Sequence, residues 1–257
     1  MCAVAIIGDQ LFTVRTYSKQ VAVYDTISLT FQRYIRVPAT CSILTGLAGC
    51  ASNHCLYMSN WWYNRIQRVD VSVESTDVVK CWPVSTQPAG LSVNTSCNVV
   101  VACWGENKLQ EYTTYGSLVR EICLQAGMTD QWHAMQLSSG NYVVTTSDMV
   151  RVIGAKGQVL HSCGEPLTTD TAYIPDLRCL GVIEDDKILV DDLSNNRILA
   201  LNSSLCSVQE LALPVEGRLR GPSALDEVRR RLYVGEYDGH HRVLVFEMVA
   251  RSDVQEQ

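Results

Sequence analysis

The chain has 257 residues, 47% of them hydrophobic, and its 21 Lys and Arg against 27 Asp and Glu give a net charge of −6. This length suffices for one large all-β domain or two smaller ones, and the acidic balance argues against DNA or another phosphate backbone as the main partner. No run of about 18 apolar residues occurs, so the sequence predicts no membrane span. The short apolar segment 2–7 lacks a basic leader and is interpreted as a strand, not as a secretory signal.

Short apolar runs bounded by polar turns predict antiparallel strands along the whole chain. The expected strands of the first three units are 3–7, 11–15, 21–24 and 31–37; then 46–48, 56–59, 65–69 and 78–82; then 88–93, 99–103, 109–112 and 118–124. Those of the last three units are 132–137, 142–146, 150–153 and 159–162; then 180–182, 188–191, 198–201 and 208–211; then 223–225, 232–235 and 243–247. For a fourth strand of the last unit only residues 253–255 remain, and the charged segment 226–231 is expected to be a turn.

One hairpin pattern recurs at a nearly constant interval. Arg65 and Lys108 are 43 residues apart, and Arg197 and Arg242 are 45 residues apart, which is the period of propeller blades. The sequence therefore predicts an all-β fold, a six-bladed β-propeller of four-stranded antiparallel blades. A closed ring of blades buries both faces of every sheet and leaves only short edges. The expected single domain spans 1–257, with blades at about 1–38, 39–84, 85–125, 126–165, 166–214 and 215–257.

Two segments resemble the NHL repeat. They are Pro88–Val93 followed by Val99–Leu109, and Val190–Ile198 with its Asp-Asp-Leu-Ser-Asn-Asn turn. The resemblance extends over essentially the whole chain, although the last unit has Gly221-Pro222-Ser223 where the family usually has Pro-x-Gly. It implies a six-bladed propeller, but NHL-type propellers include protein-docking modules, RNA-binding modules and enzymes.

In NHL propellers the loops between second and third strands, together with the segments that lead into each blade, line the usual binding surface. Aromatic and charged side chains in such loops are typical of a protein interface. The resemblance therefore predicts a non-catalytic module that binds a protein partner without a cofactor. The other interpretation is that Trp62 or Trp104 packs between adjacent blades. The predicted binding residues are Trp61, Trp62, Tyr63, Trp104, Glu106, His133, Arg178, Asn195 and Tyr237.

Two enzymatic alternatives remain, and the first of them depends on a resemblance to propeller lyases. His133 stands where propeller lyases that cleave peptidyl hydroxyglycine carry a zinc-binding histidine, but the matching positions of the other units hold Thr45, Ala89, Arg178 and Gly221. A catalytic zinc needs about three protein ligands, so no metal site is predicted. A calcium-dependent lactonase would need about six oxygen ligands from several blades. The acidic and amide residues near the inner strands do not share a register: Asp9, Asn94, Asp176, Asp226 and Glu227.

Single-stranded RNA is the alternative ligand for the same face, because some NHL propellers stack RNA bases on aromatic side chains. The basic residues expected near that face share one repeat position and are Arg65, Lys108, Arg197 and Arg242. An arginine or lysine repeated in this way more often packs its stem against neighbouring strands.

The chain has 11 cysteines, and none of them forms a C-x-x-C pair. With no signal peptide in evidence, we expect reduced, partly buried thiols and a cytoplasmic protein.

Overall fold

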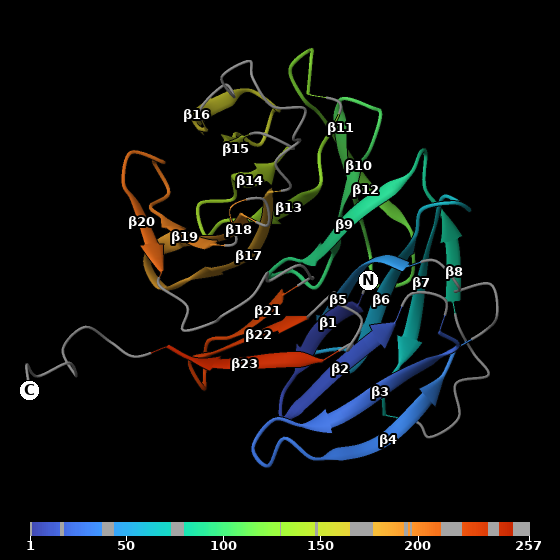
Figure 1. Cartoon of the computed structure of the whole chain (residues 1–257). Helices are drawn as coiled ribbons and strands as arrows, with labels where there is room; N and C mark the ends of the chain where they lie inside the picture. The colour runs from blue at the N-terminus through green and yellow to red at the C-terminus, as the bar shows by residue number, and fades with distance from the viewer. Residues whose placement is uncertain are drawn as a thin grey trace, which may run out of the picture.

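The computed structural model describes residues 2–15, 18–37, 44–72, 80–128, 130–146, 149–164, 177–192, 195, 197–211, 223–235 and 242–248. These residues form six antiparallel sheets that follow one another around the molecule in chain order (Figure 1). The predicted fold class, an all-β six-bladed β-propeller, is confirmed.

Each blade is built from consecutive strands. Blades 1 to 3 consist of β1 (Cys2–Ile7), β2 (Gln10–Arg15), β3 (Gln20–Asp25) and β4 (Phe31–Arg36); β5 (Leu44–Cys50), β6 (Cys55–Asn60), β7 (Arg65–Asp70) and β8 (Lys80–Pro83); and β9 (Pro88–Val93), β10 (Val99–Cys103), β11 (Lys108–Tyr112) and β12 (Leu118–Cys123). Blades 4 to 6 consist of β13 (His133–Gln136), β14 (Tyr142–Thr145), β15 (Val150–Ile153) and β16 (Val159–Cys163); β17 (Leu177–Ile183), β18 (Lys187–Asp192), β19 (Arg197–Leu201) and β20 (Val208–Leu211); and β21 (Ser223–Asp226), β22 (Arg231–Gly235) and β23 (Val243–Glu247). A short 3-10 turn, η2 (Glu184–Asp186), joins β17 to β18.

The hydrophobic core lies between the blades. Each of six apolar clusters is shared by two neighbouring blades; in the first, Phe12 of blade 1 packs with Met58 of blade 2. The last cluster joins Tyr233 of blade 6 to Val4 and Leu11 of blade 1, so the set of interfaces closes into a ring. The first strand of every blade contacts the first strand of the next, and β21 contacts β1.

The position of a strand within its blade explains its composition. Every residue of the second strands β6, β10 and β14 is buried, because neighbouring blades cover both faces of each. A strand that is buried on both faces has a nearly continuous apolar sequence, and Val99–Cys103 is an example. The outermost strands face solvent, and in β12 Ile122 alone is buried.

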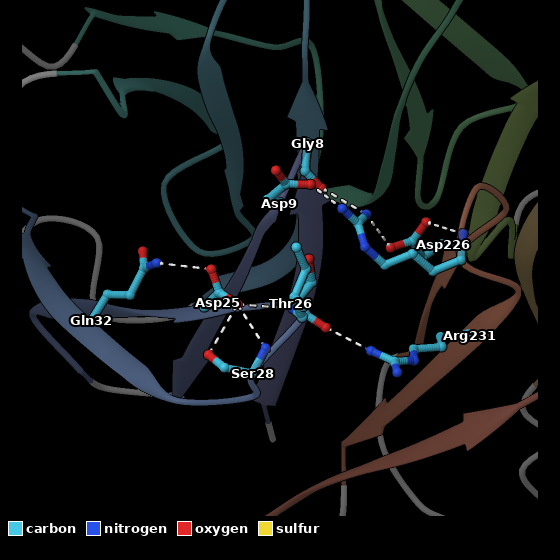
Figure 2. Close-up of polar contacts among 10 residues, drawn as sticks. Gly8, Asp9, Asp25, Thr26, Ser28, Gln32, Asp226 and Arg231 are labelled. Atoms are coloured by element: carbon cyan, nitrogen blue, oxygen red, sulfur yellow. Dashed lines mark hydrogen bonds and ion pairs between the residues drawn. The ribbon is translucent and has the colours of Figure 1, made fainter.

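Polar contacts reinforce the closure between blades 6 and 1 (Figure 2). Arg229, in the turn between β21 and β22, pairs with Asp226 through Nη1 and Oδ2 at 2.9 Å, and it also contacts the carboxylate of Asp9. Arg231 donates from Nη1 to the carbonyl oxygen of Thr26 at 2.7 Å (Figure 2). The predicted strand-to-strand turn is therefore found at residues 227–230, while Asp226 and Arg231, the ends of the predicted segment, belong to β21 and β22.

Every described strand overlaps one of the strands expected from the sequence. One boundary differs clearly: β17 begins at Leu177, ahead of the expected 180–182, because Leu177–Cys179 pair with Asp192–Val190 of β18. The expected strand 253–255 lies outside the described residues, so the described part of blade 6 has three strands. Across the described ranges, no helix combines the length and the apolar character needed to cross a membrane.

Candidate functional site

Three tryptophan side chains from successive blades lie against one another. Trp61 directly follows β6, Trp104 directly follows β10, and Trp132 directly precedes β13. The ring centroids are 5.5 Å apart for Trp61 and Trp104, 4.8 Å for Trp104 and Trp132, and 6.3 Å for Trp61 and Trp132. These distances are typical of packed aromatic pairs. We refer to Trp61, Trp104 and Trp132 as the tryptophan cluster.

The antiparallel topology explains why these residues meet. The start of a first strand lies beside the end of the second strand of its blade; Trp132 N donates to the carbonyl oxygen of Thr145 at 2.8 Å, at the end of β14. The loops between second and third strands and the segments leading into the first strands therefore share one end of the propeller. We call this end the loop face.

Hydrogen bonds to backbone carbonyl groups hold the blade 3 loop, which carries Trp104, in place. Trp104 N donates to the carbonyl oxygen of Gln87 at 2.9 Å, and Gln131 Nε2 donates to the carbonyl oxygen of Glu106 at 2.8 Å. Gly105 has φ +80°, a left-handed conformation that glycine adopts without steric cost. Because the loop is anchored to its own blade and to blade 4, little conformational entropy remains to be lost on binding.

Two further aromatic residues follow Trp61 in the blade 2 loop and face solvent. Trp62 is 68% exposed and Tyr63 is 61% exposed. Trp62 therefore does not pack between blades, which was the other interpretation of this residue. Trp61, Trp104 and Trp132 are each half-buried, and the ring of Trp104 lies against rings from blades 2 and 4, as its other interpretation expected.

His133 lies in the contact between the innermost strands of blades 3 and 4. Its Nε2 is 2.9 Å from the carbonyl oxygen of Leu91 in β9. The strands approach closely here, since a Cβ on Gly90 would lie only 2.4 Å from the carbonyl oxygen of Trp132. Among the described residues, no group of three or more His, Cys, Asp or Glu side chains is arranged to hold a metal ion.

Lys108 and Arg197, which both occupy the common repeat position, form ion pairs with carboxylates. Lys108 Nζ lies 2.7 Å from Glu106 Oε2 and 3.4 Å from Glu121 Oε1. Arg197 Nε lies 2.9 Å from Asp192 Oδ2. The hydrogen bond that Lys108 donates to the Glu106 carboxylate raises the pKa of Lys108, since it favours the charged ammonium. These contacts neutralise positive charge that a phosphate backbone would need.

The remaining predicted site residues belong to blades 5 and 6. Asn195 is exposed, and its Nδ2 donates to Asp192 Oδ2 at 2.8 Å. The backbone of Arg178 pairs with Asp191 in the sheet of blade 5, but its side chain lies outside the described residues. Tyr237 also lies outside them. The structure therefore brings together Trp61, Trp104 and Glu106 with Trp132, which is not among the predicted binding residues.

No protein-family model matches the sequence, and no curated protein is significantly similar to it. The fold nevertheless matches solved structures: hydrazine synthase of Kuenenia stuttgartiensis has a TM-score of 0.64 and 17% identity, over 96% of this chain and 76% of that one. A streptogramin B lyase has a TM-score of 0.65 and 12% identity, over 96% and 83%. The WD40 repeats of RRP9 have a TM-score of 0.63 and 15% identity, over 93% and 73%. Similarity at this level establishes the propeller fold alone, which both enzymes and repeat modules share.

Proposed function

We propose that this chain is a non-catalytic propeller of the NHL type that binds a protein partner through its loop face. The observation that supports this is the tryptophan cluster with the exposed Trp62 and Tyr63 beside it. Partly exposed tryptophans held by rigid loops have the features of binding hot spots, since large rings supply contact area at a low entropic cost. The free thiols of the described cysteines fit the proposed cytoplasmic location.

Single-stranded RNA is the second candidate, because the exposed indole of Trp62 could stack on a base. The charge pattern favours a protein instead. Lys108 and Arg197 already engage carboxylates, and the whole chain carries a net charge of −6. RNA binding depends on cations that displace the counterions of the phosphates, so it predicts an affinity that falls steeply with salt.

A metal-dependent lyase or lactonase is less well supported by the residues of this chain. His133, the residue that prompted the lyase hypothesis, directs Nε2 at the carbonyl oxygen of Leu91. This contact gives the imidazole a structural part in the junction between blades 3 and 4.

Affinity capture from an extract of the source cells tests the proposal. The double variant Trp62→Ala/Tyr63→Ala is expected to lose the captured protein, while its circular dichroism spectrum stays that of the wild type. Tyr115→Ala is the matched control, because Tyr115 is 61% exposed but lies in the turn between β11 and β12, at the opposite end of the propeller. Capture that survives the double variant, or that disappears after ribonuclease treatment, would contradict the proposal.

A further inference from the structure

Three cysteine side chains lie together at one end of the interface between blades 2 and 3. Cys50 ends β5 and is paired directly opposite Cys55 of β6 in the sheet of blade 2. Both belong to the apolar cluster that blade 2 shares with blade 3, and Cys97, from the turn between β9 and β10, packs against that cluster. The turns between first and second strands lie at the end of the propeller opposite to the loop face, so this group of thiols is separate from the tryptophan cluster.

The turn that carries Cys97 is closed by backbone hydrogen bonds and holds Cys97 in an unfavourable conformation. Cys97 N donates to the carbonyl oxygen of Asn94 at 2.9 Å, and Asn94 N donates to that of Asn98 at 3.0 Å. Cys97 has φ +60°, in the left-handed region. Blade 4 makes the same turn with Gly140, φ +83°, at this place. A side chain is disfavoured there, and backbone strain of this kind is concentrated at functional sites.

The contacts of the three thiols distinguish one pair among them. Burial raises the pKa of Cys50, and the thiol of Cys97 raises it further, which requires the two sulfur atoms to be near each other. The thiol of Cys55 makes side-chain hydrogen bonds with Arg68 and Tyr57. Cys55 is thus engaged within blade 2, whereas Cys50 and Cys97 face each other across the interface between the blades.

The two thiols of this pair differ in their access to solvent. Cys50 is 2% exposed, whereas Cys97 is half-buried, so an oxidant that arrives from solvent meets Cys97 first. Asn53 Nδ2 donates to Cys50 Sγ at 3.3 Å. A donated hydrogen bond favours negative charge on the sulfur, and the thiolate is the form of cysteine that acts as a nucleophile.

We propose that Cys50 and Cys97 form a reversible disulfide that joins blades 2 and 3 when the protein meets hydrogen peroxide. Peroxide transfers one oxygen atom to the thiol of Cys97, which becomes a sulfenic acid, and one water is released. The sulfur of Cys50 then attacks the sulfur of Cys97: the S–S bond forms, the S–O bond breaks, and the hydroxyl leaves as a second water with the proton of Cys50.

The electrons of this reaction balance, and so do those of its reversal. Two thiols lose two electrons, and one peroxide gains them and ends as two waters. Two thiols of a reductant such as glutathione restore Cys50 and Cys97 by thiol–disulfide exchange. In a reducing compartment disulfides of this kind are transient and redox-sensing. The proposal involves the chain's own residues only, so it does not depend on what the loop face binds.

Mass spectrometry of the full chain tests the proposal. The reduced protein is treated at low concentration with equimolar hydrogen peroxide, its remaining thiols are alkylated, and the protein is digested. The main disulfide is expected to join the peptides of Cys50 and Cys97, and dithiothreitol should remove it. A link between Cys50 and Cys55 in its place would overturn the proposal. So would free thiols at Cys50 and Cys97 when the exposed Cys206 is already oxidised.

Three variants identify the role of each thiol, and circular dichroism shows whether they fold. Cys97→Gly is the matched variant, since glycine occupies this turn position in blade 4; it should lose the link and leave Cys50 as a free thiol. Cys50→Ala should leave a sulfenic acid at Cys97 that dimedone labels, and Cys55→Ala should keep the link. Loss of the link in a folded Cys55→Ala, or no dimedone adduct in a folded Cys50→Ala, would contradict the proposal. If a variant does not fold, the peptide map of the wild type decides.

Thermal unfolding gives a second readout on the wild type. Cys50 and Cys97 are 47 residues apart, so the link restrains the unfolded chain and should raise Tm by about 5–10 °C relative to the reduced protein. Peroxide-treated Cys97→Gly should not show this rise. A linked protein that unfolds at a lower Tm than the reduced one would refute the proposal, because the bond would then distort the folded ring.

Discussion

Glu111 of β11 is a buried carboxylate on which the junction of blades 3 and 4 depends. Its Oε1 accepts hydrogen bonds from Nδ2 of Asn94 and of Asn98, both at 2.8 Å. Its Oε2 accepts from Arg120 Nε at 2.7 Å and from the Tyr142 hydroxyl at 3.2 Å. Tyr142 belongs to blade 4, so this one carboxylate connects two blades.

Glu111→Gln should destabilise the protein measurably. Glutamine keeps one acceptor oxygen, so the donors that now converge on two charged oxygens cannot all be satisfied, and a hydrogen bond to a charged group contributes about 1.5–3 kcal/mol. Water can hydrogen-bond to the Arg120 guanidinium in the variant, because this side chain is 39% exposed, and this offsets part of the lost stability. We therefore expect a loss of about 2–3 kcal/mol, which for a chain of this size lowers Tm by about 5–10 °C.

The same carboxylate makes the effect depend on pH. Burial alone would raise the pKa of Glu111, but the hydrogen bonds from Asn98, Arg120 and Asn94 outweigh it and hold the pKa below its usual value of 4.5. Because the pKa is lower in the folded state, the stabilisation is complete well above pH 4.5 and is lost as the pH falls through the folded-state value. The difference in the free energy of unfolding between the wild type and Glu111→Gln should therefore be constant from about pH 6 to 8 and should become smaller in acid.

Urea denaturation followed by tryptophan fluorescence at neutral and acidic pH measures both effects. Glu210→Gln is the control, since Glu210 is 58% exposed and 3.4 Å from Arg197, and it should change the free energy of unfolding by less than about 0.5 kcal/mol. The reasoning is refuted if Glu111→Gln is as stable as this control at neutral pH, or if its deficit grows on acidification.

Three further variants or reagents probe other parts of the ring. Gly90→Ala should destabilise by about 1–3 kcal/mol and shift the tryptophan fluorescence, because the added methyl would meet the Trp132 carbonyl; an unchanged Tm and spectrum would contradict this. Arg229→Met should accelerate amide exchange in β22, since the bonds that close the ring to blade 1 are lost; unchanged exchange would count against it. At pH 8 a thiol reagent should label Cys206, whose pKa is lowered by hydrogen bonds from Ser204 and Asn202, well before Cys103, whose pKa burial raises to about 12; mass spectrometry of the adducts gives the order.

Much of the fold could be predicted because its determinants are local. Apolar runs such as Val99–Cys103 and the repeated pairs Lys108-Leu109 and Arg197-Ile198 recur at the blade period, and period and turn chemistry together define the strands. The early start of β17 was not predicted, because Arg178 within its first residues gave no apolar signal. Glu111 was not singled out either, since its partners come from three different parts of the chain: the loop between β9 and β10, β12 and β14.

The candidate site could be predicted only in part. Trp61 and Trp104 follow the second strands of adjacent blades, so the repeat alone places them at equivalent positions. Trp132 belongs to a different part of its blade, before the first strand, and no sequence spacing shows that it meets the other two. Glu121 neutralises the charge of Lys108 only because β11 pairs with β12, and the sequence alone does not show this contact.

Site-specific photocrosslinking in the source cells tests the central claim, recognition through the loop face, most directly. A photoreactive phenylalanine at position 62 lies beside the tryptophan cluster, and one at position 228 occupies an equally open site, since Val228 is 90% exposed in the turn at the opposite end of blade 6. We predict a crosslink to a protein from position 62 that position 228 does not form. Crosslinks to RNA from position 62, or the same products from both positions, would contradict the account.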